Sequence, residues 1–167
     1  MVGLEDTLPK LKLIVSEVDG VLTTGEIPVD EIGNVLYKEF CIKDFEAINL
    51  LKKHFKVAFL SADNRISYNM CRRKNIPFFH DPKDKKAKLA EILKRYGVTP
   101  DEIMYIGSTY SDLECMRMVP FSVCPDDAVS DVINVSASTL PMLSGAGVFC
   151  ALYDFLKPEI QRRLKSE

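Results

Sequence analysis

Residues 11–25 read Leu-Lys-Leu-Ile-Val-Ser-Glu-Val-Asp-Gly-Val-Leu-Thr-Thr-Gly, and the rest of the predicted fold is built outward from them. The apolar run over residues 11–15 is short and partly β-branched, which is typical of a buried strand in a parallel sheet. Glu17, Asp19 and Gly20 follow it. In open α/β sheets, ligands bind beyond the carboxyl ends of the strands. Two acids there repel each other unless a cation, a lysine or a proton lies between them.

The size and composition of the chain indicate one domain over residues 1–167. A chain of this length can bury roughly two thirds of its unfolded surface. Hydrophobic residues make up 47% of the sequence and charged residues 28%, and the net charge is −2. This balance gives no indication of a nucleic-acid or membrane partner. We find no signal peptide and no run of about 18 apolar residues, so we expect a soluble, cytoplasmic protein.

Five cysteines are scattered along the chain without a Cys-x-x-Cys pair. Their odd number and wide spacing favour reduced, mostly buried thiols over a disulfide framework or a zinc site. They are Cys41, Cys71, Cys115, Cys124 and Cys150.

Short apolar strands alternate with amphipathic helices along the rest of the chain. This alternation predicts a doubly wound α/β domain with a mostly parallel sheet and right-handed crossovers. A receiver-type domain would show a similar alternation of strands and helices. Such a domain has a lysine at the end of its fifth strand, where this chain has Pro125. We expect further strands at 56–62, 77–80, 103–106, 121–124 and 135–138. We expect helices at 45–54, 65–74, 84–96, 111–118, 127–132 and from 144 onward. The last helix is expected to be broken or restarted at Pro158.

A β-hairpin flap is predicted over about residues 26–39. Two short β-rich pieces, 27–29 and 35–37, flank residues 30–34, whose sequence Asp-Glu-Ile-Gly-Asn has turn chemistry. We expect this flap to lie over the strand ends and to leave a β-rich edge for a partner. Asp44 is positioned to cap the helix that follows.

The pattern from Glu17 to Thr23 resembles the first motif of the haloacid dehalogenase (HAD) phosphatases, Asp-x-Asp-Gly-x-Leu-Thr. In that family the first Asp attacks phosphorus, the second is a general acid and base, and Mg²⁺ bridges them to the phosphate. The resemblance covers nearly the whole chain. It is greatest to small, capless members: the 3-deoxy-manno-octulosonate-8-phosphate phosphatases, the nine-carbon sugar-acid phosphatases and the carboxyl-terminal domain of some acylneuraminate cytidylyltransferases. It implies a flap without a cap domain, with Glu17 at the nucleophile's position and Asp19 at the acid/base position.

Two further motifs of that family have counterparts here. Ser61 and Ala62 match the positions whose hydroxyl and amides hold the transferring phosphoryl group, with Asp63 where an arginine is commoner. Lys85 matches the lysine that neutralises the nucleophile and the phosphate. The resemblance therefore places Lys85 beneath Glu17, although a lysine-rich helix start would supply the same residue.

The metal-binding motif of the family is altered. Residues 107–113 keep the family's glycine, its later aspartate (Asp112) and its leucine, but Ser108 and the residue after it replace two adjacent acids. Mg²⁺ prefers near-octahedral oxygen ligation that includes carboxylates. We therefore expect Glu17, Asp19 and Ser108 to form a weak or absent metal site. Mg²⁺ is the cofactor expected of an active enzyme, and otherwise none is expected.

Lys38 and Asp44 match a lysine and an aspartate that open the first helix of the family. By resemblance we expect them, together with Asp112, near the substrate and the flap. Phe45 replaces a family glycine, and residues 144–151 keep late glycines of the family but lack its Arg-Glu pair. The missing arginine belongs to substrate binding in the family.

These substitutions predict weak phosphoryl transfer. The Glu17 carboxylate lies roughly 1.5 Å further out than that of Asp, and a misplacement of about 1 Å can cost around 100-fold in rate. A serine at position 108 weakens the charge stabilisation that the metal supplies. Without a metal, Glu17, Asp19 and Lys85 could form an ion cluster of their own, retained because the loss of one member would strand a buried charge.

The leading hypothesis is a HAD-like protein of impaired catalysis, with a structural, oligomerising or regulatory role linked to sugar-acid or sugar-nucleotide biosynthesis. The alternative is an active Mg²⁺-dependent phosphatase acting on a 3-deoxy-octulosonate-type or nonulosonate-type sugar phosphate. A binding domain of another kind is the third hypothesis. By resemblance we expect a homotetramer whose flaps cover neighbouring sites, and a sugar-nucleotide-forming enzyme as a further partner.

Overall fold

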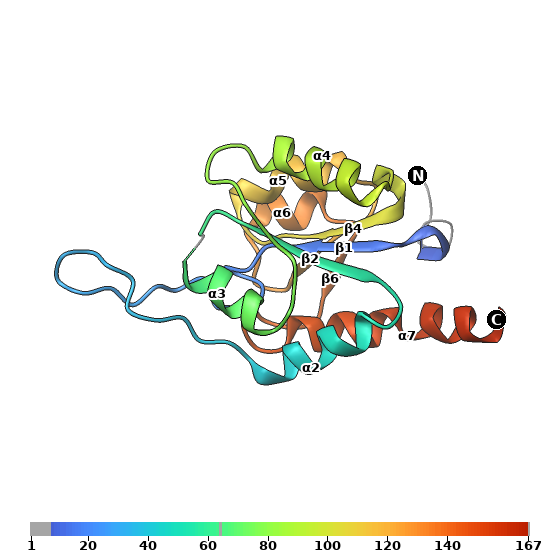
Figure 1. The fold of residues 1–167 in the computed structure, drawn as a ribbon, viewed down its shortest axis with the longest axis horizontal. Coiled ribbons are helices and arrows are strands. Elements are labelled where there is room, and N and C mark those ends of the chain that lie inside the picture. Colours follow the sequence, from blue (N-terminus) through green and yellow to red (C-terminus); the bar gives the residue numbers. More distant parts are fainter. Residues whose placement is uncertain (1–7, 64, 167) are drawn as a thin grey trace.

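The computed structural model describes residues 8–63 and 65–166. Its centre is a six-stranded, entirely parallel sheet with the strand order β3-β2-β1-β4-β5-β6 (Figure 1). The predicted doubly wound α/β fold is confirmed. The strands are β1 (Leu13–Ser16), β2 (Lys56–Ser61), β3 (Phe78–His80), β4 (Ile103–Ile106), β5 (Ser122–Pro125) and β6 (Ser138–Leu140).

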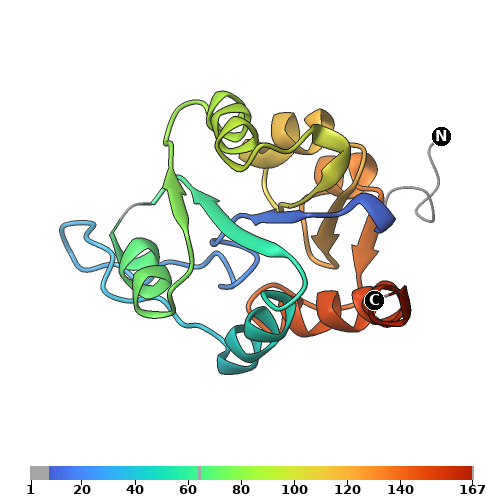
Figure 2. The ribbon, with the colours of Figure 1, turned by 45° about the vertical axis from the view of Figure 1, so that its right-hand side comes forward.

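Helices cover both faces of the sheet (Figures 1 and 2). They are α2 (Ile42–Leu51), α3 (Ile66–Arg73), α4 (Lys85–Tyr96), α5 (Leu113–Met118), α6 (Ser130–Val135) and α7 (Val148–Ser166), with short 3-10 helices η1 (Leu8–Lys10), η2 (Pro100–Glu102) and η3 (Tyr110–Asp112). α2, α3 and α7 pack on one face, and α4, α5 and α6 on the other. Among the described residues, none of these helices has the length and apolarity that a membrane crossing requires.

Burial on both faces explains why the strands read as continuous apolar runs. Every residue of β1, β4 and β5 is buried. Successive side chains of a strand point to opposite faces, so Ile14 joins one core while Leu13 and Val15 join the other. The apolar run that opens residues 11–25 is thus the central strand that we predicted.

The carboxyl ends of β1, β2 and β4 meet at one edge of the sheet. In the parallel register, Ser16 pairs with Phe59 on one side and with Ile106 on the other. The Glu17 N–H continues this pairing and donates to the Ile106 carbonyl at 2.9 Å. The acids that follow β1 therefore lie beside the loops that follow β2 and β4.

The segment between β1 and α2 is a long loop that projects from the domain (Figure 1). It contains one antiparallel bridge, between Val29 and Val35, and the Leu36 N–H donates to the Pro28 carbonyl at 2.9 Å. The hairpin predicted over residues 26–39 exists in this reduced form, without regular strands, because a two-stranded hairpin with no third strand is marginally stable in water. No folded cap domain is inserted in this segment.

Three local predictions were wrong. The last strand, predicted at 135–138, is β6 over Ser138–Leu140, because α6 continues through Val135. α7 continues through Pro158, where we expected a break. Proline removes the hydrogen bond to the carbonyl four residues earlier, and that residue, Asp154, is exposed together with Pro158, so water can replace the bond. α2 begins at Ile42, after Cys41 at the N-cap. Asp44 therefore lies inside the first turn of α2 and does not cap it.

Candidate functional site

Glu17 lies at the carboxyl end of β1 and is 4% exposed. One carboxylate oxygen, Oε1, accepts a hydrogen bond from the Val18 N–H at 2.7 Å. The other, Oε2, accepts from the ammonium group of Lys85. The longer side chain thus folds back onto its own backbone, and both oxygens have partners.

Lys85 reaches this carboxylate because α4 begins directly below it. Asp84 caps that helix, and its carboxylate accepts from the Ala87 N–H at 2.8 Å. The Lys85 ammonium also donates to Asp112 Oδ1 at 2.8 Å and to Ser111 Oγ at 3.2 Å. All three of its protons have acceptors, so the cation is held in one place.

Asp112 supports the loop after β4 from a fully buried position. Its Oδ2 accepts from the Ser108 and Thr109 N–H groups at 2.9 and 3.1 Å. Its Oδ1 accepts from the Tyr105 hydroxyl at 2.9 Å. Burial, with the charge of Asp112, raises the pKa of Tyr105 well above its usual value, so the phenol stays a donor. We expected Asp112 near the substrate, but its side chain has no exposed surface for one.

Asp19 is tied to the projecting loop by Lys38. The Lys38 ammonium donates to Asp19 Oδ2 and Asp63 Oδ2, both at 2.7 Å, and to Ser67 Oγ at 3.1 Å. Its side chain is 3% exposed. The Thr23 hydroxyl donates to the other oxygen of Asp19 at 3.1 Å. Lys38 therefore joins the flap to the ends of β1 and β2.

The loop after β2 presents Ser61 to the same edge. The Ser61 hydroxyl accepts from the Asp63 N–H at 3.3 Å, which leaves its proton available to a ligand. Ala62 is exposed, and its carbonyl lies 3.0 Å from His80 Nε2. Burial raises the pKa of Asp63, but the hydrogen bond and charge of Lys38 outweigh burial and hold that pKa at about 2. The loop thus offers a hydroxyl donor beside a carboxylate that stays ionised.

Ser108 and two glycines bring three loops into close contact. Ser108 Oγ donates to the Asp19 carbonyl at 3.4 Å. Gly20 has φ +80°, and a Cβ at this position would collide with Ser108 Oγ. Only glycine therefore fits there. From the other end of the chain, Ser144 Oγ donates to the Gly20 carbonyl at 2.6 Å, and the Gly145 N–H donates to the Val21 carbonyl at 3.0 Å.

The residues at this edge do not fit a Mg²⁺ ion. Both Glu17 oxygens are hydrogen-bonded, Asp19 Oδ2 is bonded to Lys38, and the Asp19 carbonyl accepts from Ser108. Within residues 8–63 and 65–166, no group of three or more Asp, Glu, His or Cys side chains could hold a metal ion. Mg²⁺ takes six oxygens in a near-octahedral arrangement, usually with carboxylates among them. Here each carboxylate that would face the ion already has a lysine as its counter-charge.

Asp44 is bonded to a different part of the molecule. It is fully buried, and its Oδ1 accepts from the Phe149 N–H at 2.8 Å and the Cys150 N–H at 3.3 Å. Burial raises the pKa of Asp44 to about 6, although these two amide bonds oppose the rise. We predicted Asp44 as a substrate or flap residue, but its carboxylate instead caps the start of α7, because that helix supplies unpaired N–H groups.

Four side chains of the two lysine networks were missed by the sequence analysis. Ser67 lies four residues after Asp63, and Thr23 four residues after Asp19. A spacing of four is a signal only within a helix, and Asp19 and Asp63 lie outside the helices. The other two are Ser111, whose hydroxyl accepts from Lys85, and Tyr105, whose buried hydroxyl required a polar partner that the sequence alone does not identify.

Residues 14–152 match the family model described as haloacid dehalogenase-like hydrolase. The chain belongs to the HAD-like hydrolase family. The match covers most of the chain, so the resemblance on which the sequence analysis relied is confirmed. In this HAD-like hydrolase, the residues that the sequence analysis compared with three family motifs lie at the ends of β1, β2 and β4, and Lys85 lies at the start of α4.

Similarity to known proteins indicates the subfamily to which this HAD-like hydrolase belongs. It is 29% identical over 156 residues to the 3-deoxy-D-manno-octulosonate 8-phosphate phosphatase KdsC of Haemophilus influenzae, covering 92% of this chain and 86% of that protein. It is 26% identical over 141 residues to N-acylneuraminate cytidylyltransferase A of Danio rerio, covering 82% of this chain but 33% of that protein.

A solved structure agrees with these relatives. The cobalt-bound deoxy-D-mannose-octulosonate 8-phosphate phosphatase YrbI of Haemophilus influenzae superposes with a TM-score of 0.82 and 30% identity over 90% of each chain. The HAD-like hydrolase therefore belongs to the KdsC/YrbI sugar-acid phosphatase subfamily and is related to acylneuraminate cytidylyltransferases.

Proposed function

We propose that this protein binds the phosphate ester of an acidic sugar at the carboxyl edge of its sheet and hydrolyses it slowly. The names of its relatives support this substrate class, since they include octulosonate 8-phosphate phosphatases. One structural observation carries the proposal: Lys85 holds the Glu17 carboxylate at the edge that also presents Asp19 and Ser61. This edge thus has a nucleophile, an acid–base group, a cation and a hydroxyl donor.

The contacts of these residues fit distinct roles. Ser61 can donate its hydroxyl proton to a phosphoryl oxygen. Lys85 places positive charge beside the attacking carboxylate, and a fixed charge in a buried site acts strongly on a developing charge. Asp19, held by two hydrogen bonds, donates a proton to the leaving sugar oxygen and later takes one from the water that cleaves the acyl phosphate. Glu17 attacks phosphorus as the phosphorus–oxygen bond to the sugar breaks, and water then cleaves the resulting acyl phosphate.

Hydrolysis along this route is expected to be slow. Glu17 must first break its bond to the Val18 N–H, which costs roughly 1 kcal/mol. Its longer side chain then approaches phosphorus roughly 1.5 Å from the position of an aspartate, and a misplacement of about 1 Å already costs around 100-fold. No step uses a metal, because the donor set does not fit Mg²⁺. Typical enzymes turn over roughly ten times per second, and we expect a rate at least about 100-fold lower.

A second candidate function is a structural, oligomerising or regulatory role without turnover. The hydrogen bonds of Glu17 favour it, because neither carboxylate oxygen is left for a substrate. The relation to N-acylneuraminate cytidylyltransferase A supports a sugar-nucleotide-forming enzyme as the partner. In this case the ion cluster is retained for stability, since the loss of Lys85 would strand two buried carboxylates.

Phosphate release from 3-deoxy-D-manno-octulosonate 8-phosphate decides between the two candidates. We expect slow release by the wild type, whether or not Mg²⁺ is added. The matched control is Glu17→Gln, which keeps the shape of the side chain but cannot attack phosphorus. Release by both proteins at one rate would remove Glu17 from the reaction, and no release by either would favour the structural role.

A rescue experiment tests whether the two substitutions limit the rate. Glu17→Asp combined with Ser108→Asp restores the shorter nucleophile and adds the third acid. We expect Mg²⁺-dependent release about 100-fold or more above the wild type, with Ser108→Asp alone much slower. Equal rates for the wild type and the double variant would contradict the proposed cause of slow hydrolysis.

We further propose that the protein assembles as a homotetramer through its projecting loop. Exposed apolar side chains in one region mark interaction surfaces, and in this loop Ile32 is 80% and Leu36 58% exposed. Light scattering should give the mass of four 18.8 kDa chains. Ile32→Ser with Leu36→Ser should reduce that mass, and a monomeric wild type would overturn the proposal.

A further inference from the structure

A second concave region lies at the amino-terminal edge of the sheet. Two cavities, of about 560 and 460 Å³, share the lining residues Lys52, Phe55, Lys56 and Tyr96. We treat them as one region, the amino-edge cleft. Lys56 begins β2, whereas the candidate site lies where β2 ends. The cleft is therefore separate from the site described above.

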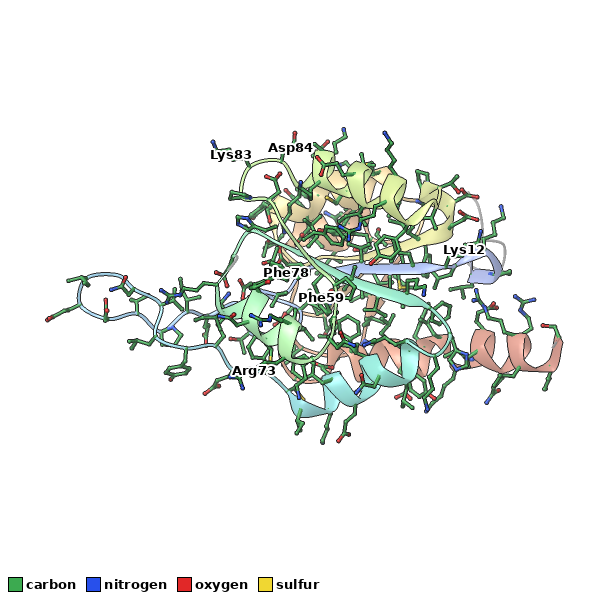
Figure 3. All side chains as sticks on the ribbon, viewed as in Figure 1. Lys12, Phe59, Arg73, Phe78, Lys83 and Asp84 are labelled. Carbon is green, nitrogen blue, oxygen red and sulfur yellow. The ribbon has the colours of Figure 1, made fainter. Side chains whose placement is uncertain are left out.

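Figure 3 shows this separation. Lys12, which lines the smaller cavity, lies at the right of the view near the start of β1, whereas Lys83 and Asp84 lie at the upper left, before α4 and the buried lysine of the candidate site. The lining of both cavities lacks Glu17, Asp19, Ser61 and Lys85. A ligand in the cleft would thus contact none of the residues proposed for hydrolysis. The cleft can be tested independently of that function.

The amino-edge cleft is strongly basic in a chain whose net charge is −2. Among residues 8–63 and 65–166, no Asp or Glu lines either cavity. The cationic lining residues are Lys12, Lys52, Lys53, Lys56, Arg72 and Arg163.

Half of these cations already have partners. Lys12 forms an ion pair with Glu102, and Arg163 Nε lies 2.7 Å from a Glu159 oxygen. Lys52 Nζ donates to a backbone carbonyl at 2.9 Å. These three side chains are held in place around the cleft. Lys12 and Arg163 are paired with carboxylates, whereas the carbonyl that Lys52 bonds to leaves the charge of Lys52 unbalanced.

The other half, Lys53, Lys56 and Arg72, form no ion pair within the part of the chain that the structure describes. All three are exposed. Cations that line a concave surface without counter-charges raise the local positive potential and attract anions. The spread of the three over both cavities favours an anion with more than one negative group.

An aromatic side chain lies beside these cations. Tyr68 is 44% exposed and lines the larger cavity, with its ring edge-on to that of Phe78 at 5.8 Å between centroids. Arg72 follows it by four residues on α3, so the two share one face of the helix. Bases stack on such rings with roughly 1–3 kcal/mol each. A ligand with a planar aromatic ring and phosphate groups could stack on Tyr68 and contact the neighbouring cations.

We propose that the amino-edge cleft binds a nucleotide carrying two or more phosphates. The base lies against Tyr68, and the phosphates extend past Arg72 and Lys56 toward Lys53. The volume of either cavity falls within the roughly 300–1,000 Å³ of small-molecule sites. A simple inorganic anion would leave the exposed ring of Tyr68 without a role.

Calorimetric titration of the full chain with ADP, without divalent metal, tests this proposal. We expect saturable binding that weakens as salt rises, since exposed charges are screened. Adenosine and inorganic triphosphate should each bind at least about tenfold more weakly than ADP, because each lacks one half of the recognition. Triphosphate binding as tight as that of ADP would overturn the nucleotide assignment, and so would a failure of ADP to saturate.

Variants locate the site. Lys56→Glu with Arg72→Glu reverses two exposed charges of the cleft and should weaken ADP binding about 100-fold or more. The control is Lys94→Glu, an exposed lysine of α4 outside the cleft, which should bind ADP like the wild type. Glu17→Gln should also bind like the wild type, whatever its effect on phosphate release. Equal losses in the cleft and control variants would overturn the proposal.

Discussion

Asp44 has a buried carboxylate whose proton affinity rises on folding. Its pKa is about 6 in the folded protein, against 3.8 ordinarily. Between these values the folded protein binds the proton more tightly than the unfolded chain does. The free energy of unfolding therefore falls as pH rises from about 4 to about 6, by about 2 kcal/mol.

Denaturant unfolding at a series of pH values measures this dependence. Asp44→Asn is the control, because asparagine keeps an acceptor for the Phe149 N–H but does not titrate. The free energy of unfolding of the wild type minus that of the variant should fall by about 2 kcal/mol across this range. A difference independent of pH would contradict the raised pKa.

Lys85 is the buried cation between Glu17 and Asp112. We expect Lys85→Met to lower the free energy of unfolding by about 3 kcal/mol, because both carboxylates lose their counter-charge. Adding Glu17→Gln should recover part of that loss. Chemical denaturation of the four proteins of this double-mutant cycle measures the coupling, and strictly additive losses would show that the pair is not coupled.

The loop before α7 supports the loop after β1, and a single glycine permits that contact. Gly145 has φ +71°, and a Cβ there would lie 2.7 Å from the Thr24 nitrogen. Gly145→Ala should lower the free energy of unfolding by about 3 kcal/mol through strain and collision. Gly97→Ala is the control, since Gly97 has φ +64° but open space around it. It should cost about 1 kcal/mol, and equal losses would exclude the steric contribution.

Lys38 fastens the projecting loop to the end of β2 through Asp63. Lys38→Met should loosen the loop and leave two carboxylates facing each other. Cleavage by chymotrypsin after Leu36 or Tyr37 should then become several-fold faster, because loops are cut where they open. Lys43→Met, at an exposed lysine of α2, should be cut like the wild type. Unchanged cleavage in both variants would show that the loop is held by other contacts.

The five strands β1 to β5 were predictable because buried parallel strands are apolar runs that can be recognised without their partners. The last strand was predicted three residues too early, because Ser138 and Thr139 of β6 are polar and partly exposed. The strand predicted at 103–106 has those bounds in the structure. The networks of Lys38 and Asp44 were not predictable, because each joins segments far apart in the sequence. No local pattern shows that Lys38 meets Asp63 or that Asp44 meets Phe149. The meeting of Lys85 with the acid after β1 was expected only through family resemblance.

The hydrogen bond from Ser144 to the Gly20 carbonyl joins positions 124 residues apart. During translation, the acid-bearing loop after β1 leaves the ribosome before its support, which is synthesised 124 residues later. A product truncated before Ser144 would carry Glu17, Asp19, Lys38 and Lys85 and still lack the segment that fixes their loop. Nascent chains of this protein should therefore acquire a native carboxyl edge only after Ser144 has been synthesised and has left the ribosome.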